Sequence, residues 1–350
     1  METITLETMA ALFRAADAAV IGTKGSRVVF ANPAAVLALG QDPTGQRASS
    51  ILPERLTQLQ SSLGAASARI RGRNAVITLT GAGLLRVYTI RFDPPVRRMP
   101  PLPTPQMSVL ANLRMAAEML RVKGMVTQAG AAHAAQILKS YYQLQRWVTN
   151  VNTLAALQEG TLPFLPENTD CAALLRHAAE ELGPMAERRG IQIFAEVPEA
   201  AAVAAADTVL LERMLMNLLS NSLLHCESGC RIRLGLAVTE QQLTITVHDT
   251  GGGIPPERVG SIFTSYDLYT GCDRQGAGCG LPVALGIIRL HGGELLIDTT
   301  PGLGTTVLVT LPRNQKTTLT LRSDPAEYRS KDRTGLFVSM ADVLEPEEFL

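Results

Sequence analysis

The sequence predicts a multidomain α+β protein made of an α+β domain, an antiparallel helical hairpin and an α/β sandwich. Its 350 residues suit about two or three domains. Six prolines cluster in FDPPVRRMPPLPTPQ at 92–106, where they forbid a helix and favour an extended spacer. Apolar residues at heptad-like spacing follow this spacer, and glycine-rich segments between strands and helices follow those. We place the boundaries at 1–95, 96–105 (linker), 106–160, 167–313 and 314–350 (tail).

Composition limits the classes of function. Hydrophobic residues make up 46% of the chain and charged residues 18%, which suits packed cores rather than disorder. Lys+Arg and Asp+Glu both number 32, so the chain lacks the basic excess of a nucleic-acid binder. No apolar run approaches the roughly 18 residues of a membrane helix, and METITLETMAALFRAAD is unlike a signal peptide. We expect a cytoplasmic protein that binds no nucleic acid and does not insert into a membrane.

The five cysteines have no framework spacing, which fits reduced thiols. His225, Cys226 and Cys230 could suggest a metal site. Packing at a turn and in the core is the better account, because no second ligand pair has zinc-site spacing.

The first 95 residues have an α+β pattern. Residues 18–40, AAVIGTKGSRVVFANPAAVLALG, predict two strands around a glycine turn and then a helix entered at Asn32-Pro33. RNAVITLT and LLRVYTIRF predict a hairpin across GAG. This order resembles a PAS sensor domain, with GSRVVFANPAA as the most similar stretch. The segment has no cysteine or histidine to attach heme or flavin in the usual way, so a PAS-like module without ligand is an equal alternative.

Two amphipathic helices are expected between 106 and 160. Thr104 can cap the first helix, with Pro105 at its first position. Each helix has one apolar stripe, formed by Leu110, Leu113, Ala117 and Leu120 in the first and by Ile137, Tyr141, Leu144, Val148, Val151 and Ala155 in the second. A lone hairpin would leave these stripes wet, so we expect a homodimer built on a four-helix bundle.

The segment 167–313 carries the residues suited to chemistry. Within DTVLLERMLMNLLSNSLLH, Asn217 and Asn221 are four residues apart and share a helix face. Strand periodicity in QLTITVHDTGGGIP puts Asp249 on the core side, where a carboxylate needs a partner such as a ligand amino group. The glycines at 251–253 then permit close backbone approach.

A second glycine run, GAGCG at 276–280, comes just before an apolar helix. Free N–H groups and the positive end of the helix dipole make such a junction an anion site. A Walker loop is excluded because Gly-Lys-Ser/Thr is absent, and a dinucleotide fingerprint because the run follows the polar CDRQ rather than a strand.

The ordered set NLLSN, DTGGGIP, IF, GAGCGL and GLGT resembles the GHKL, or Bergerat, ATP-binding fold. The resemblance implies that Asn221 holds Mg²⁺ and that Asp249 accepts the adenine amino group, supported by Thr305. It implies further ATP contacts from Gly251, Gly253, Ile254, Gly276, Gly278, Gly280 and Leu281. Asn217 in place of a glutamate is similar to the kinase branch. Kinases commonly carry a lysine where this chain has Leu224, and Arg274 could supply that charge.

Together the three parts resemble a sensor histidine kinase, but the expected phosphoacceptor helix, SVLANLRMAAEML at 108–120, has no histidine. Aligning its Leu-Arg with the family's His-Glu-Leu-Arg puts Ala111 at the histidine and Asn112 at the glutamate. Nucleophile and acid/base neighbour are both missing. His133, which begins the second helix, is the one histidine on the hairpin.

Two function classes remain open. One is an ATP-dependent protein histidine kinase with a divergent acceptor. The other is a nucleotide-binding pseudokinase that acts as a regulatory dimer or scaffold. The partner would be a response regulator or another kinase. Anti-sigma serine kinases rank third because they lack the long hairpin.

Overall fold

The computed structural model describes residues 13, 16, 18–60, 63–82, 85–92, 115, 128–259, 279–313, 321–322 and 333–349. The proline spacer, the stripe of the first hairpin helix with Ala111 and Asn112, and the residues Cys272, Arg274, Gly276 and Gly278 lie outside these ranges.

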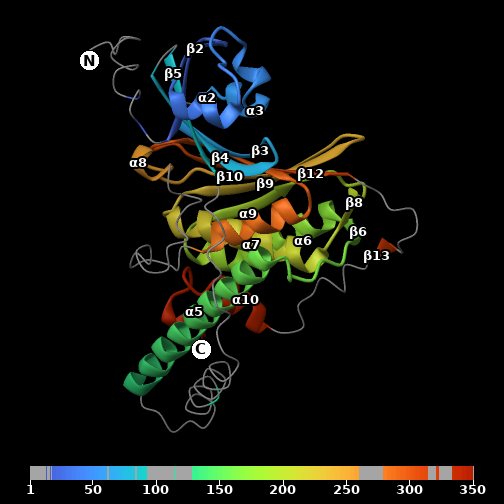
Figure 1. The fold of residues 1–350 in the computed structure, drawn as a ribbon. Coiled ribbons are helices and arrows are strands. Elements are labelled where there is room, and N and C mark those ends of the chain that lie inside the picture. Colours follow the sequence, from blue (N-terminus) through green and yellow to red (C-terminus); the bar gives the residue numbers. More distant parts are fainter. Residues whose placement is uncertain are drawn as a thin grey trace.

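A single twisted sheet of ten strands runs through the molecule, in the order β2-β1-β5-β4-β3-β11-β12-β10-β9-β7. Its N-terminal half comprises β1 (Ala19–Lys24), β2 (Arg27–Ala31), β3 (Leu63–Ile70), β4 (Arg73–Ala82) and β5 (Leu85–Phe92). The helices α2 (Pro33–Leu39), η1 (Ala48–Ser50) and α3 (Glu54–Thr57) connect β2 to β3 (Figure 1). The predicted β1–β2 turn, the Asn32-Pro33 helix start and the β4–β5 hairpin are all confirmed.

The Asn32 side chain hydrogen-bonds to α2, to β1 and to the segment before β1. Its Oδ1 accepts from the backbone of Ala35, which caps α2, and from Val20 on β1 at 2.9 Å. Its Nδ2 donates to the carbonyls of Ala16 and Ala18. A buried amide with these partners fixes the helix start against the sheet.

The two halves of the sheet join edge to edge, which the sequence did not predict. β3 pairs antiparallel with β11 (Glu294–Thr300), from Leu63↔Thr299 to Ala66↔Leu296. Ser67 adds a hydroxyl that accepts from Leu295 N at 2.9 Å. β3 is buried along most of its length, as a strand with neighbours on both sides should be.

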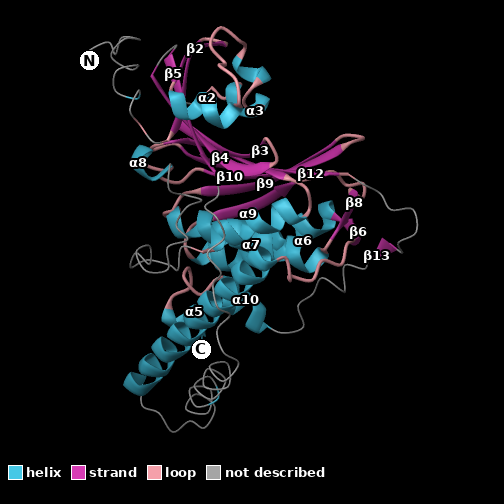
Figure 2. Ribbon diagram, in the orientation of Figure 1, coloured by secondary structure: helices cyan, strands magenta, loops and turns pink. Residues whose placement is uncertain are grey.

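The second half of the sheet is covered on one face by helices (Figure 2). The strands are β7 (Gln192–Glu196), β9 (Arg231–Val238), β10 (Gln242–Asp249), β11 and β12 (Gly304–Pro312), and the helices are α6 (Cys171–Arg188), α7 (Thr208–His225) and α9 (Gly280–Leu290). The short helix α8 (Pro256–Val259) follows β10. A small separate sheet consists of β6 (Glu167–Asp170), β8 (Val203–Ala206) and β13 (Leu321–Arg322). The predicted α/β sandwich is therefore present.

The second hairpin helix is α5 (Gln128–Glu159), 32 residues or roughly 48 Å long. Its C-terminal part packs against α9, and its N-terminal end projects away from the sheet (Figure 1). The C-terminal docking segment, residues 333–349, folds back onto it through α10 (Arg333–Ser339) and η2 (Pro346–Phe349). Tyr142 of α5 stacks on Phe349 at 5.3 Å between ring centroids and also meets Phe337.

Burial within one chain changes the expected dimer seam. Tyr141, Val148, Val151 and Ala155 are buried within one chain, whereas Ile137 and Leu144 are 44% and 43% exposed. Only part of the predicted stripe on α5 is therefore open to a second copy. Within the described ranges, no helix has the length and apolar character needed to cross a bilayer.

Candidate nucleotide-binding site

The helix α7 supplies the two predicted asparagines. Asp207 caps it by accepting from Leu210 N at 3.1 Å, and one face packs into the core. Asn217 is buried and Asn221, one turn later, is exposed. Leu224, where kinases commonly carry lysine, packs against the hydrophobic core. The site therefore has the asparagine pair but no cation at position 224.

Asp249 ends β10 with its side chain 6% exposed. Its Oδ1 accepts from the backbone N–H groups of Gly251 at 3.0 Å and Thr305 at 3.2 Å, and its Oδ2 accepts from the Ser222 hydroxyl at 3.1 Å. A carboxylate has about four acceptor positions, two on each oxygen. Protein donors therefore satisfy most of this carboxylate and leave one position on Oδ2.

The glycines after Asp249 allow backbone to pack on backbone. A Cβ at Gly251 would lie 2.7 Å from the His225 carbonyl, and one at Gly253 would overlap the Thr300 carbonyl. Gly253 also has φ +70°, a left-handed conformation that favours glycine. These close contacts are to α7 and to the β11–β12 turn, and ligand contact by Gly251 and Gly253 stays a prediction.

A threonine network supports the floor of the site. Thr299 accepts from Ile254 N at 2.9 Å and lies 3.3 Å from the Thr305 hydroxyl. Thr305 pairs with Asp249 across β10 and β12. Thr305 therefore lies beside Asp249, and Ile254 is linked to it through Thr299. Ser222 and Thr299 were not foreseen.

The phosphate end of the predicted site lies where α9 begins. Gly280 is its first residue, and Leu281 follows against the core. A Cβ at Gly280 would lie 3.2 Å from Asn217 Oδ1 and 3.6 Å from Nη2 of Arg146 on α5. The missing side chain thus lets Asn217 and a cation from α5 approach the start of α9. Arg146 could not be predicted from the sequence, because nothing local indicates which face of α5 meets α9.

Beside Asn217 lies a cleft of about 450 Å³ between α5, α7 and α10. Arg146 and Arg213 line it, and so does Asn150, whose buried Nδ2 has no hydrogen-bond partner among the described residues. Burial lowers the pKa of Arg146, while Asp342, 2.8 Å away, opposes that shift. Arg146 thus stays paired with the docking segment at the edge of the nucleotide site.

Two histidines of the sandwich, His291 and His248, have structural contacts. His291 accepts from Asp207 N through Nε2 at 3.0 Å and contacts the Ile287 carbonyl through Nδ1, and burial lowers its pKa. His248 contacts the Thr306 hydroxyl at 2.9 Å. His133 is exposed in the second turn of α5, near the end that projects from the sheet. Within the part of the chain that the structure describes, no three His, Cys, Asp or Glu residues could hold a metal together.

Comparisons with known proteins agree with this geometry. Residues 206–315 match the family of histidine kinase-, DNA gyrase B- and HSP90-like ATPases. This chain carries a GHKL ATP-binding domain, and its homologues are sensor histidine kinases. The sensor protein DivL of Caulobacter vibrioides is 28% identical over 57% of this chain and 26% of its own length. The alginate biosynthesis sensor protein KinB of Pseudomonas aeruginosa is 31% identical over 49% of this chain and 29% of its own length.

Among solved structures, full-length ShkA in complex with AMPPNP superposes with a TM-score of 0.52 at 23% identity, over 62% of this chain and 46% of that one. This likeness concerns the fold alone. The chain spans only about a quarter to a third of the lengths of DivL and KinB.

Proposed function

We propose that the α7–β10–α9 site binds Mg²⁺–ATP. The observation that carries this is the Asp249 carboxylate, held by three protein donors with one acceptor position left. An adenine amino group suits that position. The exposed Asn221 amide would hold Mg²⁺, and Asn217 and Gly280 would face the phosphates. Gly276, Gly278 and Arg274 stay predictions of the same site.

We further propose that Arg146 supplies the positive charge that Leu224 does not. A Cβ at Gly280 would lie 3.6 Å from the Arg146 Nη2, and among the described side chains it would lie nearer only to Asn217. A guanidinium is well suited to phosphate oxygens. Because the docking segment neutralises Arg146 through Asp342, its contact with nucleotide would depend on whether that segment is bound.

We propose that the whole chain is a sensor-kinase-like protein of two-component signalling. The N-terminal half would be a PAS-like sensor module, and Ile137 and Leu144 would form the open part of a homodimer seam. A response regulator or another kinase would be its partner, in the cytoplasm. Phosphate transfer requires an acceptor other than Ala111, and His133 is a candidate. The pseudokinase alternative is favoured by Ala111, Asn112 and the core-packed Leu224.

Transfer of labelled phosphate from ATP distinguishes these functions. We expect no acid-labile label on wild-type protein at residues 106–127, alone or with response regulators. Ala111→His with Asn112→Glu should create such label, and adding Leu224→Lys should increase it. Acid-labile label on wild type that His133→Gln abolishes would show that His133 is the acceptor. No label on the triple variant despite measured ATP binding would favour the pseudokinase.

A further inference from the structure

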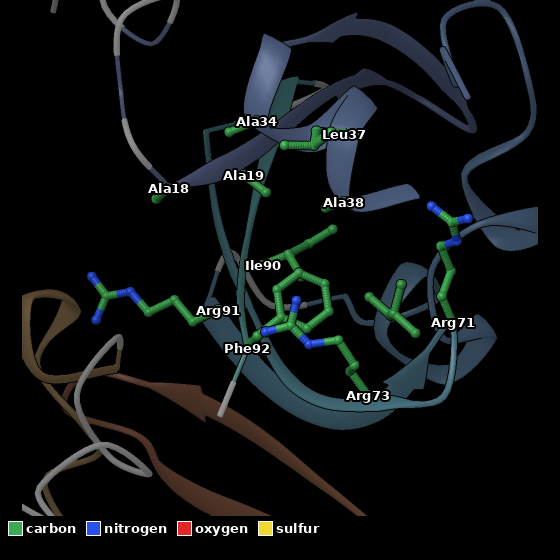
Figure 3. A pocket seen from close by; sticks show the side chains of 11 residues that line it. Ala18, Ala19, Ala34, Leu37, Ala38, Arg71, Arg73, Ile90, Arg91 and Phe92 are labelled. Carbon is green, nitrogen blue, oxygen red and sulfur yellow. The ribbon is translucent and has the colours of Figure 1, made fainter. Parts of the chain in front are cut away.

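The N-terminal half contains a hollow of about 710 Å³. It lies between α2, the ends of β1 and β5, and the β3–β4 turn (Figure 3). Its lining is formed by Ala18, Ala19, Ala34, Leu37, Ala38, Ile70, Arg71, Arg73, Ile90, Arg91 and Phe92. Eight of these residues are apolar, three are arginines and none is acidic. The hollow is therefore both apolar and positively charged.

Arg73 is held in place by an aromatic ring. The guanidinium carbon of Arg73 lies 4.3 Å from the centroid of the Phe92 ring, a cation–π contact at the edge of the hollow. Figure 3 shows Arg73 crossing that ring, with Arg71 and Arg91 on opposite sides. A guanidinium that is already oriented loses little conformational entropy when an anion binds, so the entropic cost of binding is smaller.

Arg71 occupies an unusual backbone position. It is the first residue of the two-residue turn between β3 and β4, with φ +48°, and Gly72 follows at φ +80°. Such turns favour asparagine or glycine at the first position. The guanidinium lies over Gly40, where a Cβ would come within 2.5 Å of Nη1. An ordinary explanation is that Arg71 neutralises the carbonyl end of α2, but this does not account for Arg73 or for the apolar lining.

The apolar lining limits what the occupant can be. Ile90 and Ala19 form a buried floor, whereas Leu37 on α2 is 81% exposed. A small inorganic anion would contact the arginines and leave the exposed Leu37 side chain in water. A molecule with a carboxylate and an apolar chain would pair with the guanidinium fork and remove apolar surface from water.

We propose that this hollow is a binding site for an organic carboxylate that carries an apolar chain. The site is independent of the proposed nucleotide site. Its lining includes the end of β5, and β4 and β3 connect β5 to β11 of the ATP-binding half within the same sheet. A ligand in the hollow would therefore contact β5, a strand of the sheet that also contains the strands of the ATP-binding half.

Titration of the full chain with decanoate tests the proposal by calorimetry. Binding should be saturable, and Arg73→Gln should weaken it about tenfold or more, since it removes a charge-assisted pair. The affinity of Arg73→Lys for decanoate should fall between those of wild type and Arg73→Gln, because lysine keeps the charge but lacks the two-pronged guanidinium. Ala38→Leu should weaken binding by filling the hollow. Arg47→Gln, the same change on an exposed arginine outside the lining, should have no effect.

Related probes decide the chemistry of the occupant. Decanol should bind much more weakly than decanoate, and acetate or inorganic phosphate should not compete at equal concentration. Equal binding of decanol, or equal loss in the Arg47 variant, would overturn the site. Competition by phosphate would reduce it to an anion patch, and binding of anionic phospholipid vesicles in place of decanoate would make it a membrane surface. Each of these results contradicts the proposal, whether or not ATP binds.

Discussion

The ion pair between Arg146 and Asp342 should decide whether the docking segment stays on α5. The two side chains are 10% and 11% exposed, and their charged atoms are 2.8 Å apart. Gln143 donates a second hydrogen bond to Asp342 at 3.3 Å. The change to make is Asp342→Ala, which leaves the Arg146 guanidinium buried without its counter-charge.

The expected cost follows from that burial. Removing one partner of a buried pair destabilises by about 3–5 kcal/mol, since the remaining charge is uncompensated. The loss should fall mainly on docking of residues 333–349, because the sandwich core does not depend on Asp342. At about 1.4 kcal/mol per decade, segment opening should rise at least a hundredfold. The Lys139–Glu345 pair, 3.7 Å apart and with the Glu345 side chain 68% exposed, is a matched control, and Glu345→Ala should cost under about 1 kcal/mol.

Hydrogen exchange of the docking segment measures this directly. The amides of Met340, Val343 and Leu344 bond within the segment, so their exchange reports its opening. Asp342→Ala should accelerate their exchange far more than Glu345→Ala does. Replacing both partners, as Arg146→Met with Asp342→Leu, should restore protection. Equal acceleration by the two single variants would show that the Arg146–Asp342 pair is not what holds the docking segment on α5.

Three further predictions concern assembly, pH and phosphate. Leu144→Asp should leave the fold intact, because Leu144 is 43% exposed, and should convert a dimer to monomers in sedimentation velocity; a monomeric wild type at micromolar concentration would exclude the seam. Burial lowers the pKa of His291 below its ordinary 6.5, so the unfolded chain binds more protons. The free energy of unfolding should therefore fall as pH drops below about 6.5, and His291→Gln should reduce that slope in urea titrations, although His225 adds to it in the same direction. Arg146→Gln with Asp342→Asn should weaken ATP binding by about 1–3 kcal/mol while sparing adenosine; equal loss for both ligands would place Arg146 away from the phosphates.

The local signals of the fold could be predicted because each depends on near neighbours in sequence. Asn32-Pro33 specifies a capped helix start, and period two in β10 puts Asp249 on the core side. The asparagine pair on α7 follows from helical spacing alone. These features need no knowledge of distant contacts.

The unforeseen features all depend on residues far apart in sequence. The β3–β11 pairing joins residues more than 200 positions apart. Nothing in the sequence of either strand indicates which other strand it pairs with. Ser222 and Thr299 become site residues only once α7, β10 and β11 are assembled. Tyr141 and Val148 were expected in a dimer seam, but both are buried in the hydrophobic core of one chain. The neighbouring Tyr142 stacks on Phe349 of the docking segment, a contact between residues more than 200 positions apart.

The most direct measurement of the central claim is calorimetric titration of ATP into wild type, Asp249→Asn and Asp298→Asn. In Asp249→Asn the Oδ1 contacts with Gly251 and Thr305 can persist, and the Ser222 hydroxyl can turn to accept from the new amide. The fold should therefore survive, while the adenine amino group meets a donor in place of an acceptor. We predict that ATP binding weakens by about 1–3 kcal/mol in Asp249→Asn and is unchanged in Asp298→Asn, the same substitution on the opposite face of the sheet. Equal ATP affinity in wild type and a folded Asp249→Asn variant would contradict the nucleotide site.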